Sequence, residues 1–282
     1  MKFEVIGNIG NRVTFSAFNK IKTTLLTRPK CLFLLFAILF SINSHALERE
    51  DNIFGLVLTG PIEKGDFKRF INFVKSDKSV DQRGIVITSN GGDVLEAIKI
   101  GIFIRKAGMA VTVRGKCLSA CFFIWAAGVN RYMHTNPVIG IHRPYYDPEY
   151  FAGLSLIDAD KLYASMQASA RRYLIRMGIS NELIEKMFAT PSDSMYRLKA
   201  SDFDGIFKTS AAFDEWVKSK CNILTTAEEN DFDPNDRWEK DAVKKYSSPA
   251  HFNYLSKKYT EYEKCVEKLV VESRAKAVGE VE

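Results

Sequence analysis

Three short stretches between residues 89 and 142 carry groups that could together catalyse acyl transfer. Gly91-Gly92 follows an apolar run directly and opens a helical pattern, which leaves backbone N–H groups free to bind a developing oxyanion. Ser119 stands at the start of an apolar helical run, and His142 follows the apolar run 138–141. A serine nucleophile, an imidazole base and an oxyanion site are the parts that acyl transfer needs, with a third group to orient the imidazole.

Taken singly, each of these features also has an ordinary structural interpretation. A Gly-Gly pair is commonly a plain tight turn, and a serine at a helix start is commonly an N-cap. A single histidine at a strand end is more often structural than catalytic. Candidates for a catalytic histidine are few, because only His134, His142 and His251 follow residue 46. The joint occurrence of the three features in one stretch favours a catalytic site over three separate structural roles.

Strands and helices alternate around these residues, which predicts an α/β fold with parallel strands and right-handed crossovers. The apolar runs that predict strands are 53–59, 84–88, 109–113, 132–133 and 138–141. The apolar spacing between them predicts helices over 63–76, 93–106 and 119–127. After residue 143 the pattern predicts helices over 154–177, 181–188 and 251–275, with a solvated polar linker over 230–236.

The three stretches resemble motifs of the Clp protease proteolytic subunit, within the wider Clp/crotonase fold. Residues 89–94 (SNGGDV) resemble its Ser-Pro-Gly-Gly-x-Val turn, with Asn90 in place of the proline. Residues 114–128 (RGKCLSACFFIWAAG) resemble its nucleophile segment, and 138–144 (VIGIHRP) resembles its Val-Met-Ile-His-Gln-Pro. The motifs occur in the family's order. More narrowly, the chain is similar to predicted periplasmic proteins of this fold that share a Ser-Ala-Cys core.

The resemblance implies a Clp/crotonase-like repeated β-β-α superhelix with a C-terminal helical extension. The expected division is a signal peptide over 1–46, a catalytic domain over 47–211 and the helical extension over 212–282.

The resemblance also implies roles for individual residues. Ser119 would be the nucleophile and His142 the general base, while Gly92 and Ala120 would supply the two N–H groups of the oxyanion hole. The family's acidic residue corresponds best to Asp193, which stands 51 residues after His142. Two neighbouring carboxylates are interpreted as lying on the surface of a small helix: Asp202 and Asp204.

Four cysteines follow residue 46: Cys117, Cys121, Cys221 and Cys265. Their even number favours disulfides in an oxidising compartment, and proximity suggests Cys117–Cys121 and Cys221–Cys265 among three possible pairings. On one helical turn the first pair would lie about 6 Å apart, and we hypothesise that their bond rigidifies the nucleophile turn. Reduced buried cysteines and a thiol nucleophile are the alternatives. A zinc site is disfavoured, because neither Cys-x-x-Cys nor paired histidines occur at ligand spacing.

The net charge of +6 is concentrated in the first 46 residues, which hold six basic residues and one acidic residue. The remaining chain holds 34 basic and 33 acidic residues, so we expect no nucleic-acid partner. A basic leader, the apolar run 31–42 and Ser44-His45-Ala46 predict a signal peptide cut after Ala46. That run is shorter than a membrane span, which disfavours an uncleaved anchor. We expect a periplasmic or secreted chain.

Together these features predict an exported serine hydrolase, an ATP-independent peptidase that cleaves peptides or unfolded chains through an acyl-enzyme. Clp proteases depend on an ATP-driven unfoldase, but an exported chain has no ATP supply, so no ATPase partner is expected. Cys121 beside the nucleophile supports an alternative, a catalytically silent binding or scaffold protein. Crotonase-type chemistry on an acyl-thioester is disfavoured by export, because coenzyme A is cytosolic. No cofactor is expected, and helical additions in this fold suggest a homo-oligomer.

Overall fold

Seven strands form one sheet in the computed structural model, which describes residues 46–50, 55–77, 83–207, 209–239 and 241–281. The sheet runs in the order β1-β2-β3-β4-β6-β7, and β5 also pairs with β4. Parallel pairing joins β2, β3, β4, β5 and β6, whereas β1 and β7 are antiparallel edge strands. The strands are β1 (Glu48–Glu50), β2 (Leu56–Thr59), β3 (Gly84–Ser89), β4 (Ala110–Leu118), β5 (Arg131–Met133), β6 (Val138–Ile141) and β7 (Tyr196–Arg197).

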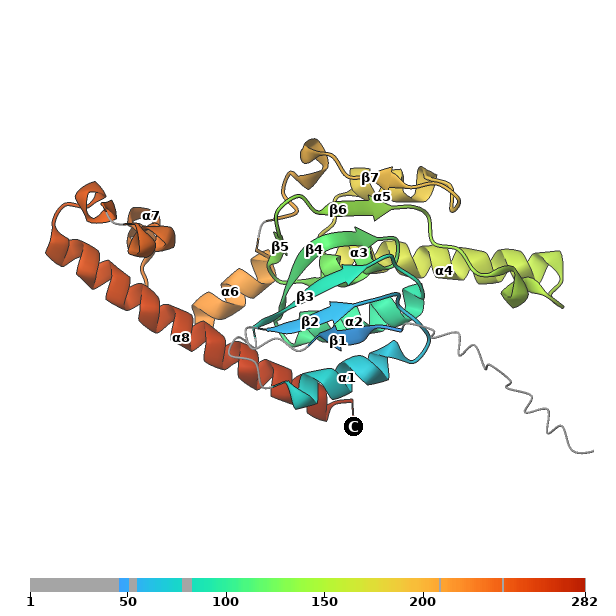
Figure 1. Cartoon of the computed structure of the whole chain (residues 1–282), viewed down its shortest axis with the longest axis horizontal. Helices are drawn as coiled ribbons and strands as arrows, with labels where there is room; N and C mark the ends of the chain where they lie inside the picture. The colour runs from blue at the N-terminus through green and yellow to red at the C-terminus, as the bar shows by residue number, and fades with distance from the viewer. Residues whose placement is uncertain (1–45, 51–54, 78–82, 208, 240, 282) are drawn as a thin grey trace, which may run out of the picture. The chain divides into compact units, whose positions relative to one another are not determined.

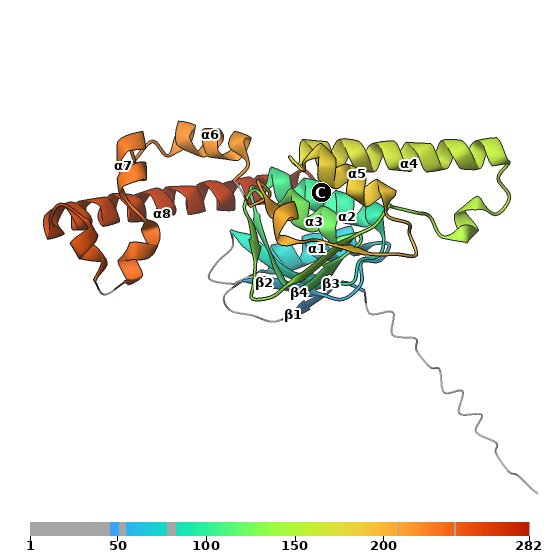
Figure 2. The ribbon, with the colours of Figure 1, turned by 90° about the horizontal axis from the view of Figure 1, so that it is seen from above.

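Helices α1 (Asp66–Ser76), α2 (Val94–Lys106) and α3 (Cys121–Ala127) connect the parallel strands. Figure 2 shows them on one side of the sheet, with α4 (Leu156–Arg176) and α5 (Asn181–Ala189) farther out on the same side. Every residue of α3 is buried, because α3 lies between the sheet and the outer helices. Gly101 of α2 makes the close packing possible, since a Cβ there would lie 1.8 Å from the Tyr173 hydroxyl oxygen of α4.

The C-terminal segment contributes α6 (Ala211–Lys220), α7 (Thr226–Asp231) and the long α8 (Pro249–Gly279) (Figure 1). The end of α8 packs near α1 through a buried ion pair: Arg274 Nη2 lies 2.8 Å from Asp77 Oδ2 and donates to Val74 O. Cys221 at the end of α6 forms a disulfide with Cys265 of α8. This segment is therefore tied to the sheet domain by an ion pair and internally by a covalent bond.

The predicted solvated linker over 230–236 is wrong in part. The structure has α7 there, followed by a short 3₁₀ helix over Pro234–Trp238. Asp236 is buried rather than solvated, because its carboxylate accepts hydrogen bonds from Lys245 Nζ and the Tyr246 hydroxyl. These bonds lower the pKa of Asp236, the one from Lys245 most.

The α/β fold class and the C-terminal helix are confirmed. Two boundaries on either side of Ser119 differ from the prediction. Strand β4 continues five residues beyond Val113 to Leu118, and α3 begins at Cys121 rather than at Ser119. The described residues make up one compact unit, and the division at 211/212 stays a prediction. The signal peptide lies outside the described residues except for Ala46. Among the helices that the structure describes, none is long and apolar enough to cross a membrane.

Candidate active site

A cavity of about 550 Å³ lies where β3, β4 and β6 end, and we call it the Ser119 cavity. Gly92 follows β3, Ser119 follows β4 and His142 follows β6, and all three line this cavity. Parallel strands bring their carboxyl ends to the same edge of a sheet, which is why residues so far apart in sequence meet there. Ala120 and Asp193 do not line the cavity; Ala120 is fully buried beside Ser119.

Ser119 occupies a constrained turn between β4 and α3. Its φ of 54° lies in the left-handed region, which costs a residue with a side chain about 1–2 kcal/mol. Its N–H donates to Gly140 O of β6 at 2.8 Å, and its carbonyl accepts from Phe122 N at 3.0 Å. The N-cap interpretation is wrong, because Ala120 is the N-cap residue and α3 receives no side-chain cap bond. Within the described residues, the Ser119 hydroxyl has no hydrogen-bond partner, His142 included.

The Gly-Gly turn packs directly against this serine. Both glycines have positive φ, 97° at Gly91 and 138° at Gly92. A Cβ at Gly91 would lie 2.7 Å from the Ser119 Cβ, and one at Gly92 would lie 2.0 Å from Ile62 O. Gly92 pairs with Ile62 in a parallel bridge whose two bonds use Gly91 O and Asp93 N. The N–H of Gly92 therefore points away from Ile62 and is left over for another acceptor.

His142 is buried beside the Ser119 cavity, with 8% of its surface exposed. Its Nδ1 lies 2.9 Å from Arg143 O, and because a carbonyl oxygen can only accept, Nδ1 carries the proton of this bond. The neutral ring then has its lone pair on Nε2, the nitrogen that a general base uses. The Tyr145 ring packs beside the imidazole, with ring centroids 5.8 Å apart.

The three carboxylates considered from the sequence lie in different surroundings. Asp193 is exposed, and its Oδ1 accepts a hydrogen bond from the Ser194 hydroxyl at 3.3 Å. Asp204 is exposed as expected. Asp202 is not a surface carboxylate: it is buried and accepts from Lys186 Nζ, Tyr196 OH and Lys199 N at 2.8–2.9 Å. Burial would raise the pKa of Asp202, but these hydrogen bonds outweigh burial and lower it.

Asp202 is thus committed to holding the segment around β7, and it has no part in orienting His142. The Nδ1 position that a triad acid would occupy is bonded to the main chain instead. Asp193 as the third member of a triad stays a prediction.

The remaining lining was missed by the sequence reasoning. Aromatic and sulfur-containing side chains contribute much of it: Tyr145, Tyr146, Tyr150, Met166 and Met195. Charged side chains contribute four carboxylates and one ammonium group: Glu63, Asp93, Asp147, Glu149 and Lys64. The signal available in the sequence was the run YYDPEY over 145–150, which begins three residues after His142. Burial, then the neighbouring Tyr150 and Asp93, raises the pKa of Tyr146.

Both suggested disulfides are present, Cys117–Cys121 with an S–S distance of 2.00 Å and Cys221–Cys265 with 1.95 Å. The Cys117–Cys121 bond leaves Cys121 without a free thiol that could act as a nucleophile. In the part of the chain that the structure describes, no cluster of three or more His, Cys, Asp or Glu side chains could hold a metal ion.

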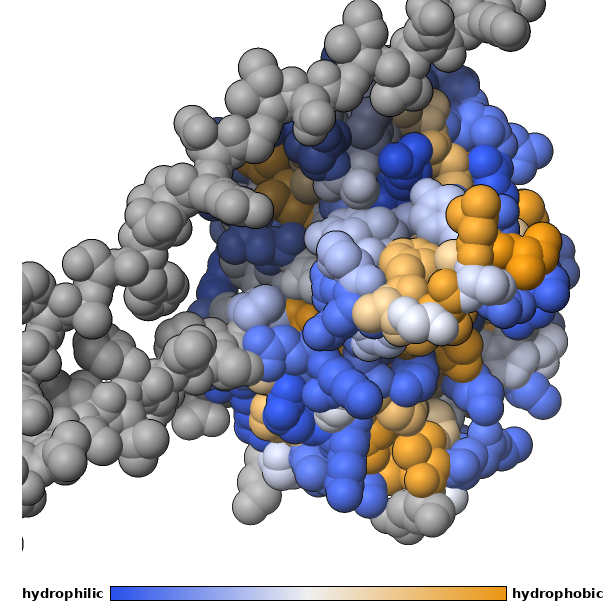
Figure 3. Space-filling view, turned by 90° about the vertical axis from the view of Figure 1, so that its right-hand side faces the viewer, coloured by the Kyte–Doolittle hydropathy of each residue, from blue (hydrophilic) through white to orange (hydrophobic). Residues whose placement is uncertain are grey.

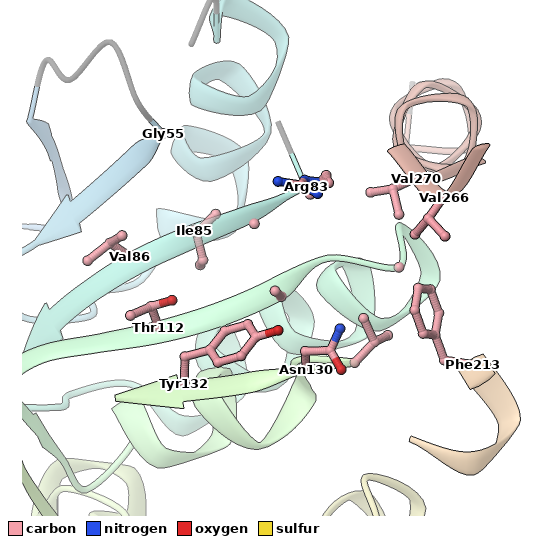
Figure 4. Close-up of a pocket in the computed structure, with 14 residues that line it drawn as sticks. Gly55, Arg83, Ile85, Val86, Thr112, Asn130, Tyr132, Phe213, Val266 and Val270 are labelled. Carbon is pink, nitrogen blue, oxygen red and sulfur yellow. The ribbon is translucent and has the colours of Figure 1, made fainter. Parts of the chain in front are cut away.

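A second cavity, of about 360 Å³, lies at the amino ends of β3 and β4, and we call it the Val270 cavity. Figure 4 shows Val266 and Val270 of α8 and Phe213 of α6 on one side of it, and residues of the sheet on the other. No serine, cysteine or histidine is among its lining residues.

No protein-family model matches the chain, and no curated protein matches it. Among solved structures, it is similar to a mutant of ClpP1 from Listeria monocytogenes, with 20% sequence identity and a TM-score of 0.41. The similarity covers 56% of this chain and 92% of that chain. A likeness at this level carries no argument about activity, so the function must be argued from the site itself.

Proposed function

We propose that the chain is an exported serine hydrolase, an ATP-independent peptidase that forms an acyl-enzyme on Ser119. The observation that carries the proposal is the Ser119 cavity, which Ser119, His142 and Gly92 all line. Two further features support the proposal: Ser119 is half-buried in a left-handed turn at the cavity wall, and the Nδ1 bond of His142 leaves the lone pair of the base on Nε2.

In the proposed reaction, Ser119 Oγ attacks the carbonyl carbon of a peptide bond while His142 Nε2 accepts the hydroxyl proton. The N–H groups of Gly92 and Ala120 would donate to the oxyanion that forms. The tetrahedral intermediate then collapses, the C–N bond breaks and the amine leaves with the proton held by His142. Water, deprotonated by the same imidazole, then attacks the ester carbon, the C–Oγ bond breaks, and Ser119 Oγ takes the proton back from His142 as the acid product leaves.

The third member of the triad is a separate question. Arg143 O holds the imidazole in the resting structure, and Asp193 is the carboxylate that the sequence predicts for this role. A carbonyl oxygen fixes the tautomer but provides no full negative charge for the imidazolium that the reaction forms. That observation supports a second candidate function, a binding protein that keeps the cavity without turnover.

The lining of the Ser119 cavity supports peptides that carry positively charged side chains. Four carboxylates and one ammonium group line it, and complementary charge favours cationic over anionic ligands. Tyr145 and Tyr150 are exposed beside these carboxylates, and their rings could form cation–π contacts with a ligand.

Export and assembly form the rest of the proposal. Two disulfides are typical of proteins that fold in an oxidising compartment, which agrees with the predicted signal peptide and with action without an ATPase.

A homo-oligomer is supported by the start of α4, where Leu156 and Ile157 are 80% and 60% exposed. Figure 3 shows apolar groups gathered between hydrophilic ones on a face of the molecule that includes this region. Light scattering after size-exclusion chromatography measures the assembly, and Leu156→Glu should reduce it.

Digestion of a peptide library without nucleotide, with the products identified by mass spectrometry, tests the proposed activity. We expect cleavage by the wild type, enriched in Lys and Arg near the cut, and none by Ser119→Ala. Ser165→Ala is the matched control, because Ser165 is exposed on α4 and does not itself line the cavity, so this variant should cleave normally. Binding of cationic peptides without cleavage by any variant would support the second candidate function instead.

A further inference from the structure

A disulfide spans the proposed nucleophile. Cys117 and Cys121 are bonded across Leu118, Ser119 and Ala120, with their Cα atoms 5.2 Å apart. Both cysteines are fully buried, so the bond lies inside the fold and not on its surface.

The two ends of this disulfide belong to different elements. Cys117 lies in β4, where it is paired with Ser89 of β3 on one side and Ile139 of β6 on the other. Cys121 is the first residue of α3. The bond therefore fixes the distance between the carboxyl end of a central strand and the start of a buried helix.

The turn between these ends is one that needs to be held. Ser119 has a side chain and a φ of 54°, and such a residue leaves the left-handed region unless its surroundings prevent it. The surroundings do so on three sides. Gly140 O accepts from the Ser119 N–H, Gly91 fills the space against the Ser119 Cβ, and the disulfide closes the turn covalently.

The second disulfide closes a much longer loop than the one around Ser119. Cys221 and Cys265 are 44 residues apart, whereas Cys117 and Cys121 are 4 apart. A cross-link restricts the unfolded chain more as the loop that it closes grows longer. The short loop around Ser119 gives less stability by this route than the long one, and its distinctive consequence is local geometry.

We propose that the Cys117–Cys121 disulfide is a positioning element for Ser119. It holds the serine in the left-handed turn beside Gly91, and without it Ser119 reacts slowly in a chain that is still folded. This inference rests on the proposed function, in which Ser119 is the nucleophile.

The test compares two double variants, Cys117→Ala/Cys121→Ala and the matched control Cys221→Ala/Cys265→Ala. For each, the rate constant of fluorophosphonate modification at Ser119 and the midpoint of thermal unfolding are measured. We expect modification of the first variant to slow by about 10–100-fold, because a small displacement of a reacting group costs about that much. We expect the control to lose more thermal stability and to react within about 2-fold of the wild type. A folded first variant that reacts as fast as the wild type overturns the proposal.

A second variant and a structural readout keep the proposal open to contradiction. Cys117→Val/Cys121→Ala suits a strand residue and a helix residue, and it serves if the alanine pair does not fold. If neither variant folds, the disulfide is needed for folding and the proposal is overturned. A crystal structure of the folded variant gives the φ of Ser119, which we expect to leave the left-handed region; a φ still near 54° overturns the proposal. This readout applies even if the wild type is not modified, a result that contradicts the proposed function alone.

Discussion

The Ser119 cavity and the Val270 cavity lie at opposite ends of the same parallel strands and differ in what their backbones offer. At the carboxyl ends, the turns after β3 and β4 contain Gly91, Gly92 and Ser119, all with positive φ. At the amino ends, Gly84 begins β3 pressed against β4: a Cβ there would lie 2.8 Å from Ala110 O. The turns at the carboxyl ends supply a hydroxyl and an unused N–H, whereas Gly108, the positive-φ glycine that lines the Val270 cavity just before β4, supplies no side chain.

This difference shows why a cavity alone does not identify a site. The Val270 cavity is lined by Ile85, Val86, Val129 and two valines of α8, among other residues (Figure 4). Such a surface can be filled by a ligand or by a side chain, and although the Thr112 and Tyr132 hydroxyls line it, no histidine lines it that could activate them as nucleophiles. Substitutions at each end of the strands test this difference.

The largest effect is expected from His142→Ala. Removal of the general base should slow fluorophosphonate modification of Ser119 by about 10²–10⁴-fold, because that is what positioned proton transfer commonly contributes. His134→Ala is the matched control, since His134 is exposed and does not line the Ser119 cavity. Equal modification rates in the two variants would remove His142 from the mechanism.

Gly92→Ala should have the next largest effect, about 100-fold on the modification rate. A methyl group at this position would lie 2.0 Å from Ile62 O, so the backbone must shift and carry the Gly92 N–H with it. Gly153→Ala is the control, because Gly153 also has a positive φ but nothing lies within 4 Å of its Cβ position. The control should lose about 1 kcal/mol of stability and keep its reactivity. If Gly92→Ala reacts normally, this N–H has no part in the oxyanion hole.

Asp193→Asn separates the sequence prediction from the observed geometry. Because Arg143 O already fixes the tautomer of His142, we expect the modification rate to fall by less than about 10-fold. A loss of about 10³-fold or more would place Asp193 in the triad and would require it to replace Arg143 O at Nδ1.

Asp202→Asn should change stability and leave reactivity nearly unchanged. Its loss removes the hydrogen-bonded carboxylate that Lys186 and Tyr196 contact, at a cost of about 1–3 kcal/mol in the free energy of unfolding at pH 7. The folded-state pKa of Asp202 is lowered, so its contribution is present above the unfolded pKa of about 3.9 and is lost as pH falls through the folded value. Urea unfolding at pH 7 and at pH 3 should show the difference from wild type shrinking with acid. A constant difference would contradict the ionic origin.

The smallest effect is expected at the far end of the sheet. Val270→Phe adds volume to the Val270 cavity and should leave the modification rate of Ser119 within about 2-fold, at a stability cost of at most about 1–3 kcal/mol. A folded variant that reacts more than about 10-fold slower would mean that the two ends of the sheet are coupled.

The local hydrophobic pattern was enough to predict most of the strands of the sheet and the helices that connect them. It failed where the apolar pattern stopped before the strand did: β4 continues through the half-buried Arg114 and the exposed Gly115 and Lys116. A two-residue edge strand such as β7 has too short a pattern to stand out. The elements that carry Gly92, Ser119 and His142 were still predicted, and in the structure these three residues line one cavity.

The side-chain partners at the site depended on contacts that spacing along the chain does not contain. Asp193 and Asp202 are close in sequence, yet one is exposed and the other is buried because Lys186 and Tyr196 reach it from other elements. The bond from His142 Nδ1 to Arg143 O follows from how the chain turns after β6, which the residue types alone do not fix. The pairing of Ile62 with Gly92 is likewise a contact between distant segments.

Fluorophosphonate labelling of the oxidised chain from Leu47 onward tests most directly whether the Ser119 cavity holds an activated serine. The modified residue is mapped by mass spectrometry, with circular dichroism to show that each variant is folded. We expect a single modification at Ser119, absent in Ser119→Ala and strongly slowed in His142→Ala. A folded wild type that is not modified, or is modified at another residue, would mean that Ser119 is not an activated nucleophile.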